Sequence, residues 1–246
     1  MVPWREIGAA LLDLLAPSLC PACRLAEGPD LCVDCWARVP RLSDPCPRCG
    51  TPGVKPDGAC RTCVGEGIPH IRRVVVQYPY RGLMKELVGN AKAAGRPSAV
   101  RALASLMPPL PAGTSPEAVV VPVPPARGRR PGPHLATALA KALAHRHQLP
   151  FRRLLRITRL AAEQHRLTLA ERRANVEDLF VCRGDAPNQV VLIDDLLTSG
   201  ATASSAAAAL REAGAKRVVL VCLARTPRRG ENEDPTNIAD EESIEI

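Results

Sequence analysis

The stretch that decides the fold is Val190-Val191-Leu192-Ile193-Asp194-Asp195-Leu196-Leu197-Thr198-Ser199-Gly200-Ala201-Thr202. Its first four residues are apolar and mostly β-branched, which predicts a strand buried on both faces of a parallel sheet and ending at Ile193. Two acidic residues follow the strand, and a loop of small and hydroxyl-bearing residues comes next. The alanine-rich segment 203–213 then favours a helix. This order of elements predicts a turn that binds phosphate.

The acidic pair and the loop predict two different chemical roles. Loop N–H groups and hydroxyls donate to phosphate oxygens, whereas carboxylates repel phosphate and suit ribose hydroxyls or a Mg²⁺ ion that carries pyrophosphate. The stretch resembles the phosphoribosyl pyrophosphate (PRPP) loop of type I phosphoribosyltransferases; the alternative is an ordinary strand–turn–helix junction. The resemblance implies that Asp194 and Asp195 are catalytic and that PRPP contacts Thr198, Ser199, Gly200, Ala201 and Thr202.

Composition and charge favour a globular protein with anionic partners. The chain has 246 residues, enough for one moderate domain and one small domain, and a net charge of +8. The segment 231–246 holds seven acidic residues and no Lys or Arg, so the rest of the chain carries +15. A basic body favours polyanions or phosphorylated substrates, although a solvated basic surface is the alternative. Aromatic residues make up only 2%, which argues against a nucleic-acid-binding sheet of stacked rings.

Eight of the ten cysteines form four C-x-x-C pairs near the N-terminus. Two such pairs supply the four thiolates of a tetrahedral zinc site, so we expect about two structural zinc ions. Sequential pairing of the knuckles and a cross-braced arrangement both fit the spacing. Disulfides are less consistent with the absence of a secretion signal. The expected ligands are Cys20, Cys23, Cys32, Cys35, Cys46, Cys49, Cys60 and Cys63.

The middle of the chain alternates strand and helix patterns, which predicts a parallel α/β sheet flanked by helices. Strands are expected at 74–76, 119–121 and 218–223, and helices at 82–95, 98–107 (with Ser98 as N-cap) and 135–144. Pro122 to Pro125 form a stiff loop, and arginines follow from Arg127 on. This loop, including Pro124 and Arg127, is a candidate for a second phosphate group such as pyrophosphate. A rigid solvated turn is the alternative.

The expected organisation has four parts. An amphipathic helix occupies 1–16, a cysteine-rich zinc ribbon 17–66, the α/β domain 67–230 and a disordered acidic tail 231–246. No apolar run is long enough for a membrane span, and a cytoplasmic protein is expected. Cys182 and Cys222 are expected to be inert core residues.

Taken together, these motifs resemble the ComF family, whose members combine a double zinc ribbon with a type I phosphoribosyltransferase domain and act in bacterial DNA uptake. The similarity covers roughly 17–225 and includes Val121-Pro122-Val123-Pro124, the Q-x-x-L-x-x-x-x-R-x-x-N pattern of 164–175, and the PRPP loop. The family's K-x-x-G element stands here as Lys92 and Gly95. Lys92 and Arg127 are therefore candidates for pyrophosphate binding.

Two departures from related patterns shape the expected function. Many family members carry R-G-x-N-Q after the proline loop, where this chain has 130–134 as Arg-Pro-Gly-Pro-His. Purine-salvage enzymes carry an Asp at the position of Thr198, and threonine cannot serve as that general base at neutral pH. The resemblance implies a protein that binds PRPP with Mg²⁺, or a nucleotide, together with single-stranded DNA and DNA-uptake proteins. An active phosphoribosyltransferase and a catalytically silent PRPP sensor are the alternatives. The ribbon is either a DNA or partner contact or a scaffold.

Overall fold

The computed structural model describes six stretches of the chain. These are residues 19–26, 30–54, 60–94, 97–125, 134–158 and 179–227.

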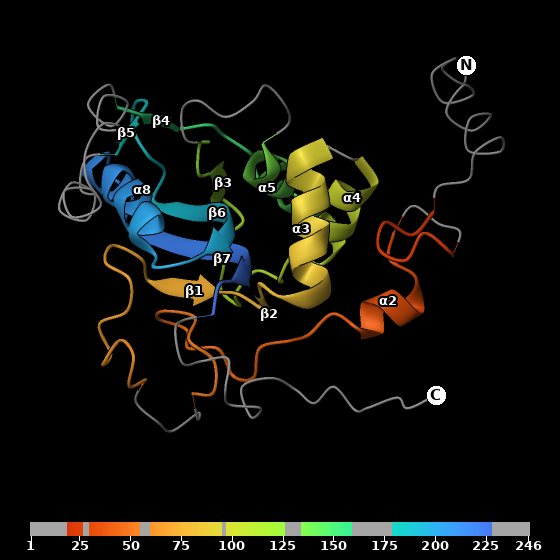
Figure 1. Ribbon diagram of the computed structural model, residues 1–246. Helices are drawn as coiled ribbons and strands as arrows, with labels where there is room; N and C mark the ends of the chain where they lie inside the picture. The colour runs from red at the N-terminus through yellow and green to blue at the C-terminus, as the bar shows by residue number, and fades with distance from the viewer. Residues whose placement is uncertain are drawn as a thin grey trace, which may run out of the picture.

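A parallel sheet forms the centre of the protein (Figure 1). The longest strands, β6 (Gln189–Leu197) and β7 (Arg217–Arg225), lie side by side in the middle. β3 (Val119–Pro122) pairs with the outer edge of β6, while β1 (Arg73–Val75) and β2 (Tyr78–Pro79) pair with β7. Both faces of the sheet are covered, which explains why its central strands are almost continuously apolar. The predicted α/β class is confirmed.

Helices and the ribbon divide the two faces between them. The apolar side chains of α3 (Gly82–Ala94), α4 (Pro97–Ser105) and α5 (Leu135–Arg146) form one core with one face of the sheet. The other core contains α8 (Ala201–Glu212) and residues of an antiparallel pair, β4 (Leu155–Ile157) and β5 (Phe180–Cys182). Side chains at helical spacing, such as Leu135, Leu139 and Leu143, supply the buried stripes.

The cysteine-rich segment contributes to both cores. Cys46, Cys49 and Cys60 are buried in the same core as the apolar side chains of α8. The first part of the ribbon, which includes α2 (Val33–Ala37), reaches the opposite core through Val39. The two halves of the ribbon therefore pack against opposite faces of one sheet.

Several predicted boundaries differ from the structure. β6 does not end at Ile193 but continues to Leu197, because its hydrogen-bonded pairing with β7 extends to Arg225. Ser98 is not an N-cap, since α4 already begins at Pro97, and proline suits the first helical position. α8 begins two residues earlier than residue 203. The antiparallel β4–β5 ladder was not predicted from the sequence.

Some predictions fall outside the described residues. These are the helix at 1–16, the acidic tail, Arg127, Gly95 and the whole 164–175 pattern. The four-part division of the chain stays a prediction. None of the helices in the described residues is long and apolar enough to cross a membrane.

Candidate functional site

The hydroxyl loop joins β6 to α8 at one end of the sheet. Thr198 and Ser199 are exposed, and Thr202 is exposed in the first turn of the helix. Gly200 is buried with a φ of 85°, a left-handed conformation that favours glycine. No side chain caps α8 at Gly200 by a hydrogen bond. The first N–H groups of α8 thus adjoin hydroxyl groups that an anion can contact.

The acidic pair lies in β6, three to four residues before this loop. The Asp195 N–H donates to Oδ1 of Asp194 over 2.8 Å. From α3, Lys92 brings its Nζ to 2.5 Å from Oδ2 of Asp195. The structure therefore unites the acidic pair with Lys92, which the sequence analysis proposed only for pyrophosphate binding.

The two carboxyl groups differ in acidity. Burial, together with the charge of Asp195, raises the pKa of Asp194 well above its usual value. Burial also opposes ionisation of Asp195, but the Lys92 ammonium outweighs it and lowers the pKa of that carboxyl group. The site thus pairs a carboxyl group that ionises more readily than usual, Asp195, with one that ionises less readily, Asp194. Carboxylate oxygens of this kind can accept hydrogen bonds from the hydroxyl groups of a ligand.

Asn substitutions of the acidic pair are expected to change stability in opposite directions. Asp194→Asn should raise the melting temperature of the ligand-free protein at pH 7. Folding makes an ionised Asp194 costly, because burial raises the folded pKa of this carboxyl group above the unfolded value of about 4. That cost grows as pH rises from about 4, so the gain from Asp194→Asn should grow with it.

Asp195→Asn should instead lower the melting temperature, since it leaves the Lys92 ammonium without its carboxylate. The folded pKa of Asp195 is lowered, so its stabilisation is present above about pH 4 and is lost as pH falls through the folded value. Thermal melts from pH 4 to 8 measure both effects. If the two variants changed the melting temperature equally and in the same direction, the opposite pKa shifts of Asp194 and Asp195 would be contradicted.

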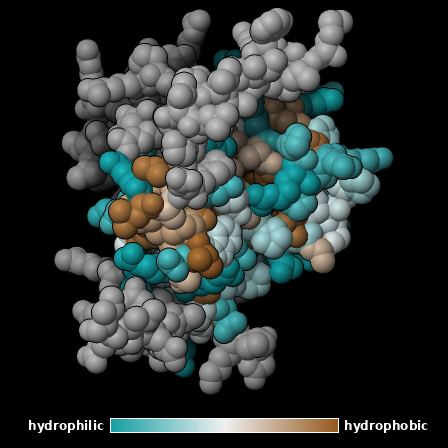
Figure 2. All heavy atoms as spheres, turned by 90° about the vertical axis from the view of Figure 1, so that its right-hand side faces the viewer, coloured by the Kyte–Doolittle hydropathy of each residue, from teal (hydrophilic) through white to brown (hydrophobic). Residues whose placement is uncertain are grey.

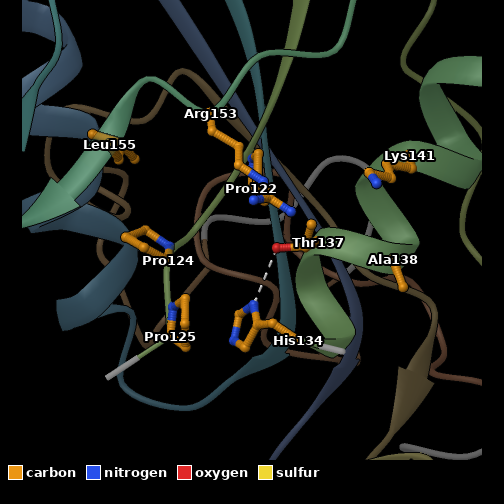
Figure 3. A pocket seen from close by; sticks show the side chains of 9 residues that line it. All are labelled: Pro122, Pro124, Pro125, His134, Thr137, Ala138, Lys141, Arg153 and Leu155. Carbon is orange, nitrogen blue, oxygen red and sulfur yellow. Dashed lines mark hydrogen bonds between the residues drawn. The ribbon is translucent and has the colours of Figure 1, made fainter. Parts of the chain in front are cut away.

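A pocket of about 410 Å³ lies beside the acidic pair, at the edge formed by β3 (Figure 3). The Val123 N–H donates to the carbonyl of Ile193, so the proline loop leaves the sheet level with Asp194. The lining of the pocket includes two buried apolar residues, Pro122 and Leu155. His134, at the start of α5, lines the pocket and is close enough to Asp195 to lower the pKa of that carboxyl group further.

Cationic side chains from two elements face this pocket. In Figure 3 the guanidinium group of Arg153 reaches toward Thr137, and Thr137 Oγ1 lies 3.4 Å from Nδ1 of His134. Lys141 lines the same pocket from α5 and also lies over the Phe151 ring. Pro124 was predicted from the sequence as a ligand contact, whereas Lys141 and Arg153 were not. No short motif contains these two cations, because only the folded chain brings them to one pocket. Their position after a strand–loop–helix unit is the signal that could have indicated them.

The eight cysteines form two separate clusters, as the sequential pairing predicts. In each cluster the four sulfur atoms lie within 4.8 Å of one another. The cross-braced arrangement is therefore excluded. The clusters consist of Cys20, Cys23, Cys32 and Cys35 (the first cluster) and of Cys46, Cys49, Cys60 and Cys63 (the second cluster).

Both clusters fit structural zinc. Sulfurs bound to a tetrahedral zinc ion lie about 3.8 Å apart, and representative separations here are 3.8 Å for Cys23–Cys32 and 3.9 Å for Cys46–Cys63. Backbone N–H groups donate to the sulfurs, as Arg48 does to Cys46 over 3.4 Å. Burial raises the pKa of Cys20, but N–H donors including that of Cys32 lower it to about 6. Such donors favour the thiolate that binds metal.

The two other cysteines do not belong to a cluster. Cys222 is fully buried in β7, and burial raises the pKa of its thiol well above the usual value. Cys182 is partly buried, and burial raises the pKa of its thiol as well. Both shifts disfavour the reactive thiolate. Cys222 is a core residue, as predicted, whereas Cys182 is only partly buried and packs against the core.

Comparisons with known proteins agree with this architecture. The double zinc ribbon domain family matches residues 11–64, and the phosphoribosyl transferase domain family matches residues 119–243. The chain is 31% identical over 228 residues to the DNA utilization protein YhgH of Salmonella typhimurium, a match that covers 87% of this chain and 99% of that protein. The chain belongs to the ComF family. YhgH of Escherichia coli strain K12 is 30% identical over the same share of both chains.

The ComF assignment accounts for both parts of the structure. The matched phosphoribosyltransferase region begins at β3, whereas β1, β2, α3 and α4 precede it and complete the sheet and one core. Among solved structures, that of TT1426 from Thermus thermophilus resembles 51% of this chain and 80% of its own, with 18% identity and a TM-score of 0.31.

Proposed function

We propose that this ComF protein binds PRPP through the β6–α8 turn. The loop from Thr198 to Thr202 holds the 5′-phosphate, and Asp194 and Asp195 engage the ribose hydroxyls. The observation that carries the proposal is the juxtaposition of the acidic pair with an exposed hydroxyl loop at a helix N-terminus. Charge complementarity between the anion and the helix N-terminus supplies part of the affinity.

The pocket beside the acidic pair is the place for the pyrophosphate end of PRPP. With the 5′-phosphate at the loop and the ribose at the acidic pair, the substituent on C1′ extends toward β3. Pro124, Arg153 and Lys141 line this pocket. Lys92 and Arg127 are proposed to assist in binding the pyrophosphate, and Mg²⁺ would be carried in by the pyrophosphate itself.

Calorimetric titration with PRPP and Mg²⁺ tests the proposal. We expect saturable binding to the full chain, and much weaker binding of ribose 5-phosphate, which lacks the pyrophosphate. Asp195→Asn should weaken PRPP binding at least about tenfold, since a hydrogen bond to a charged group contributes about 1.5–3 kcal/mol. Asp185→Asn removes an exposed carboxylate away from the loop and is the matched control. No PRPP binding by the wild-type chain would reject the proposal.

We further propose that the first part of the ribbon binds single-stranded DNA and that the protein acts with DNA-uptake proteins. Its YhgH relatives are named for DNA utilization. Trp36 is 39% exposed on α2, and Arg24 and Arg38 are exposed nearby in the sequence. Figure 2 views the side of the molecule where α2 lies, and hydrophobic and strongly hydrophilic residues lie next to each other on it. An exposed indole ring is suited to stacking on a base, and exposed arginines of the same segment can pair with backbone phosphates.

Trp36→Ala is expected to weaken binding of a fluorescent single-stranded oligonucleotide about tenfold, because stacking on one aromatic ring contributes about 1–3 kcal/mol. Fluorescence anisotropy at several salt concentrations measures it, and affinity should fall steeply with salt. Val33→Ala, at a position 80% exposed on the same helix, is the control. Unchanged binding of Trp36→Ala would reject the ribbon as the DNA contact.

A working phosphoribosyltransferase is the second candidate, favoured by the pocket next to the acidic pair. In that reaction the C1′–O bond to pyrophosphate breaks, and a bond from C1′ to an acceptor base forms. Thr198 offers no general base, so the acceptor would have to lose its proton without help from that residue. Release of pyrophosphate with a panel of bases tests this candidate. Saturable PRPP binding without release would favour a PRPP sensor.

A further inference from the structure

The second half of the zinc ribbon touches the back of the candidate phosphate loop. Ile68 follows the last knuckle and is 6% exposed. A Cβ atom placed on Gly200 would lie only 2.7 Å from Cδ1 of Ile68 and 3.1 Å from its Cγ1. The glycine of the loop and the isoleucine of the ribbon are therefore packed directly against each other, and no larger residue fits at Gly200.

Ile68 is held in this place by both knuckles of the second cluster. Its N–H donates to the carbonyl of Arg48 over 3.1 Å, and Arg48 lies inside the Cys46–Cys49 knuckle. The Arg48 guanidinium donates to the carbonyl of Glu66 over 2.9 Å, and the Glu66 N–H donates to the carbonyl of Cys63. The segment 66–68 is thus hydrogen-bonded to the Cys46–Cys49 knuckle through the backbone and the side chain of Arg48. It is hydrogen-bonded to the Cys60–Cys63 knuckle through the backbone of Cys63.

A second contact lies just before the loop. A Cβ atom on Gly50, directly after the Cys46–Cys49 knuckle, would lie 3.0 Å from Cδ2 of Leu197, the last residue of β6. Thr51 receives a hydrogen bond of 3.4 Å from the buried Arg225 of the neighbouring strand. Residues directly beside the second cluster, Gly50 and Ile68, therefore contact the chain on both sides of Thr198 and Ser199.

The first cluster has a different position. Its cysteines belong to neither apolar core, and this part of the ribbon packs through Val39 against the core of α3, α4 and α5. The core that contains α8, which begins at the phosphate loop, includes three cysteines of the second cluster. Loss of metal from the second cluster would thus disturb the core that contains α8, whereas loss of metal from the first cluster would not disturb it directly.

We propose that Ile68 is a positioning residue for the phosphate loop, and that metal in the second cluster and a phosphoribosyl ligand in the loop are bound with positive coupling. The inference about the ligand rests on the proposed function. A loop of small residues loses considerable conformational entropy when it closes on a phosphate. The ribbon holds the loop in shape beforehand, so the ligand need not supply that ordering. Coupling between two binding sites is reciprocal.

Hydrogen exchange and ligand binding of matched isoleucine variants test the positioning role. Ile68→Ala should accelerate amide exchange in 198–203 at least about tenfold and weaken PRPP binding by a similar factor, while two zinc ions remain bound. Ile71→Ala removes the same atoms from the same core, three residues away from the contact, and should leave loop exchange near the wild-type value. Ile68→Val removes Cδ1 but keeps the two Cγ atoms that also face Gly200, and should restore both properties in part.

Zinc release from the wild-type chain tests the coupling without any variant. With PRPP bound, transfer of zinc from the second cluster to a chelator should slow, and release from the first cluster should not change. Mass spectrometry of cysteines alkylated as they lose metal distinguishes the clusters. Typical coupling between sites predicts a change of about 5-fold or more.

The possible outcomes separate this inference from the proposed function. If wild-type protein fails to bind PRPP but Ile68→Ala still accelerates loop exchange, the proposed ligand is wrong and the positioning role stands. If Ile68→Ala matches wild type in loop exchange, the positioning role is overturned, whatever the chain binds. If PRPP binds but slows release from both clusters equally, or from neither, the coupling is overturned.

Discussion

Cys49→Ser is expected to remove one of the two zinc ions and to destabilise the protein by about 5 kcal/mol. Zinc supplies about 10–16 kcal/mol to the folding of isolated finger peptides, and the apolar core around this cluster retains part of the structure without it. Cys49 is 4% exposed and belongs to the core that includes Leu192 and Leu197. Loss of the ion should therefore loosen the sheet as well as the ribbon. Elemental analysis and thermal melts measure the two effects.

Cys35→Ser is the matched variant in the first cluster. Cys35 is 2% exposed, so it also removes a buried ligand, but its cluster belongs to neither apolar core. We expect the same loss of one zinc ion with a clearly smaller fall in melting temperature. Equal falls for the two variants, or two zinc ions retained by Cys49→Ser, would contradict the structural difference between the clusters.

Gly200→Ala is expected to destabilise the protein by about 2–5 kcal/mol and to abolish binding at the candidate phosphate loop. A Cβ atom at a φ of 85° costs about 1–2 kcal/mol. The collision with Ile68, at 2.7 Å, adds an overpacking cost of about 1–3 kcal/mol. Because the loop has to move to relieve this collision, its N–H groups are displaced from the ligand. Denaturant unfolding and PRPP titration measure the two results.

Gly214→Ala separates backbone strain from the collision. Gly214 has a φ of 105°, but a Cβ atom there would meet no atom closer than 3.8 Å. This variant should lose only the strain cost and should keep its affinity for PRPP. Adding Ile68→Ala to Gly200→Ala should recover part of the lost stability, since it opens space for the new methyl group. A double variant no more stable than Gly200→Ala would show that the collision is not the cause.

The phosphate turn and the cysteine clusters could be predicted because both are local in sequence. The stretch from Val190 to Thr202 contains its own apolar run, carboxylates, hydroxyls and helix start, so the order of these elements can be predicted without knowing what surrounds them. The C-x-x-C spacing likewise determines which thiols can reach one metal ion, although it did not choose between sequential and cross-braced pairing. The strand boundary at Ile193 was wrong because the end of β6 depends on its pairing with β7, which lies far along the chain.

The contacts that surround the turn could not be predicted in the same way. Lys92 meets Asp195 across about one hundred residues, and Arg153 and His134 line one pocket only because α5 folds back along β3. Such pairs have no period or spacing that a single sequence reveals. The contact of Ile68 with Gly200 could not be predicted for the same reason, since Gly200 belongs to a loop that is distant in the sequence.

By itself, the sequence determined the α/β class, the eight clustered thiols and the acidic pair with its hydroxyl loop, because backbone preference and short-range spacing specify each of them. Only the tertiary structure decided that the two halves of the ribbon pack on opposite faces of the sheet, and that the second half packs against the loop between β6 and α8. The physical reason is that apolar surfaces attract without regard to order in the chain, so which surfaces meet depends on how well whole elements pack.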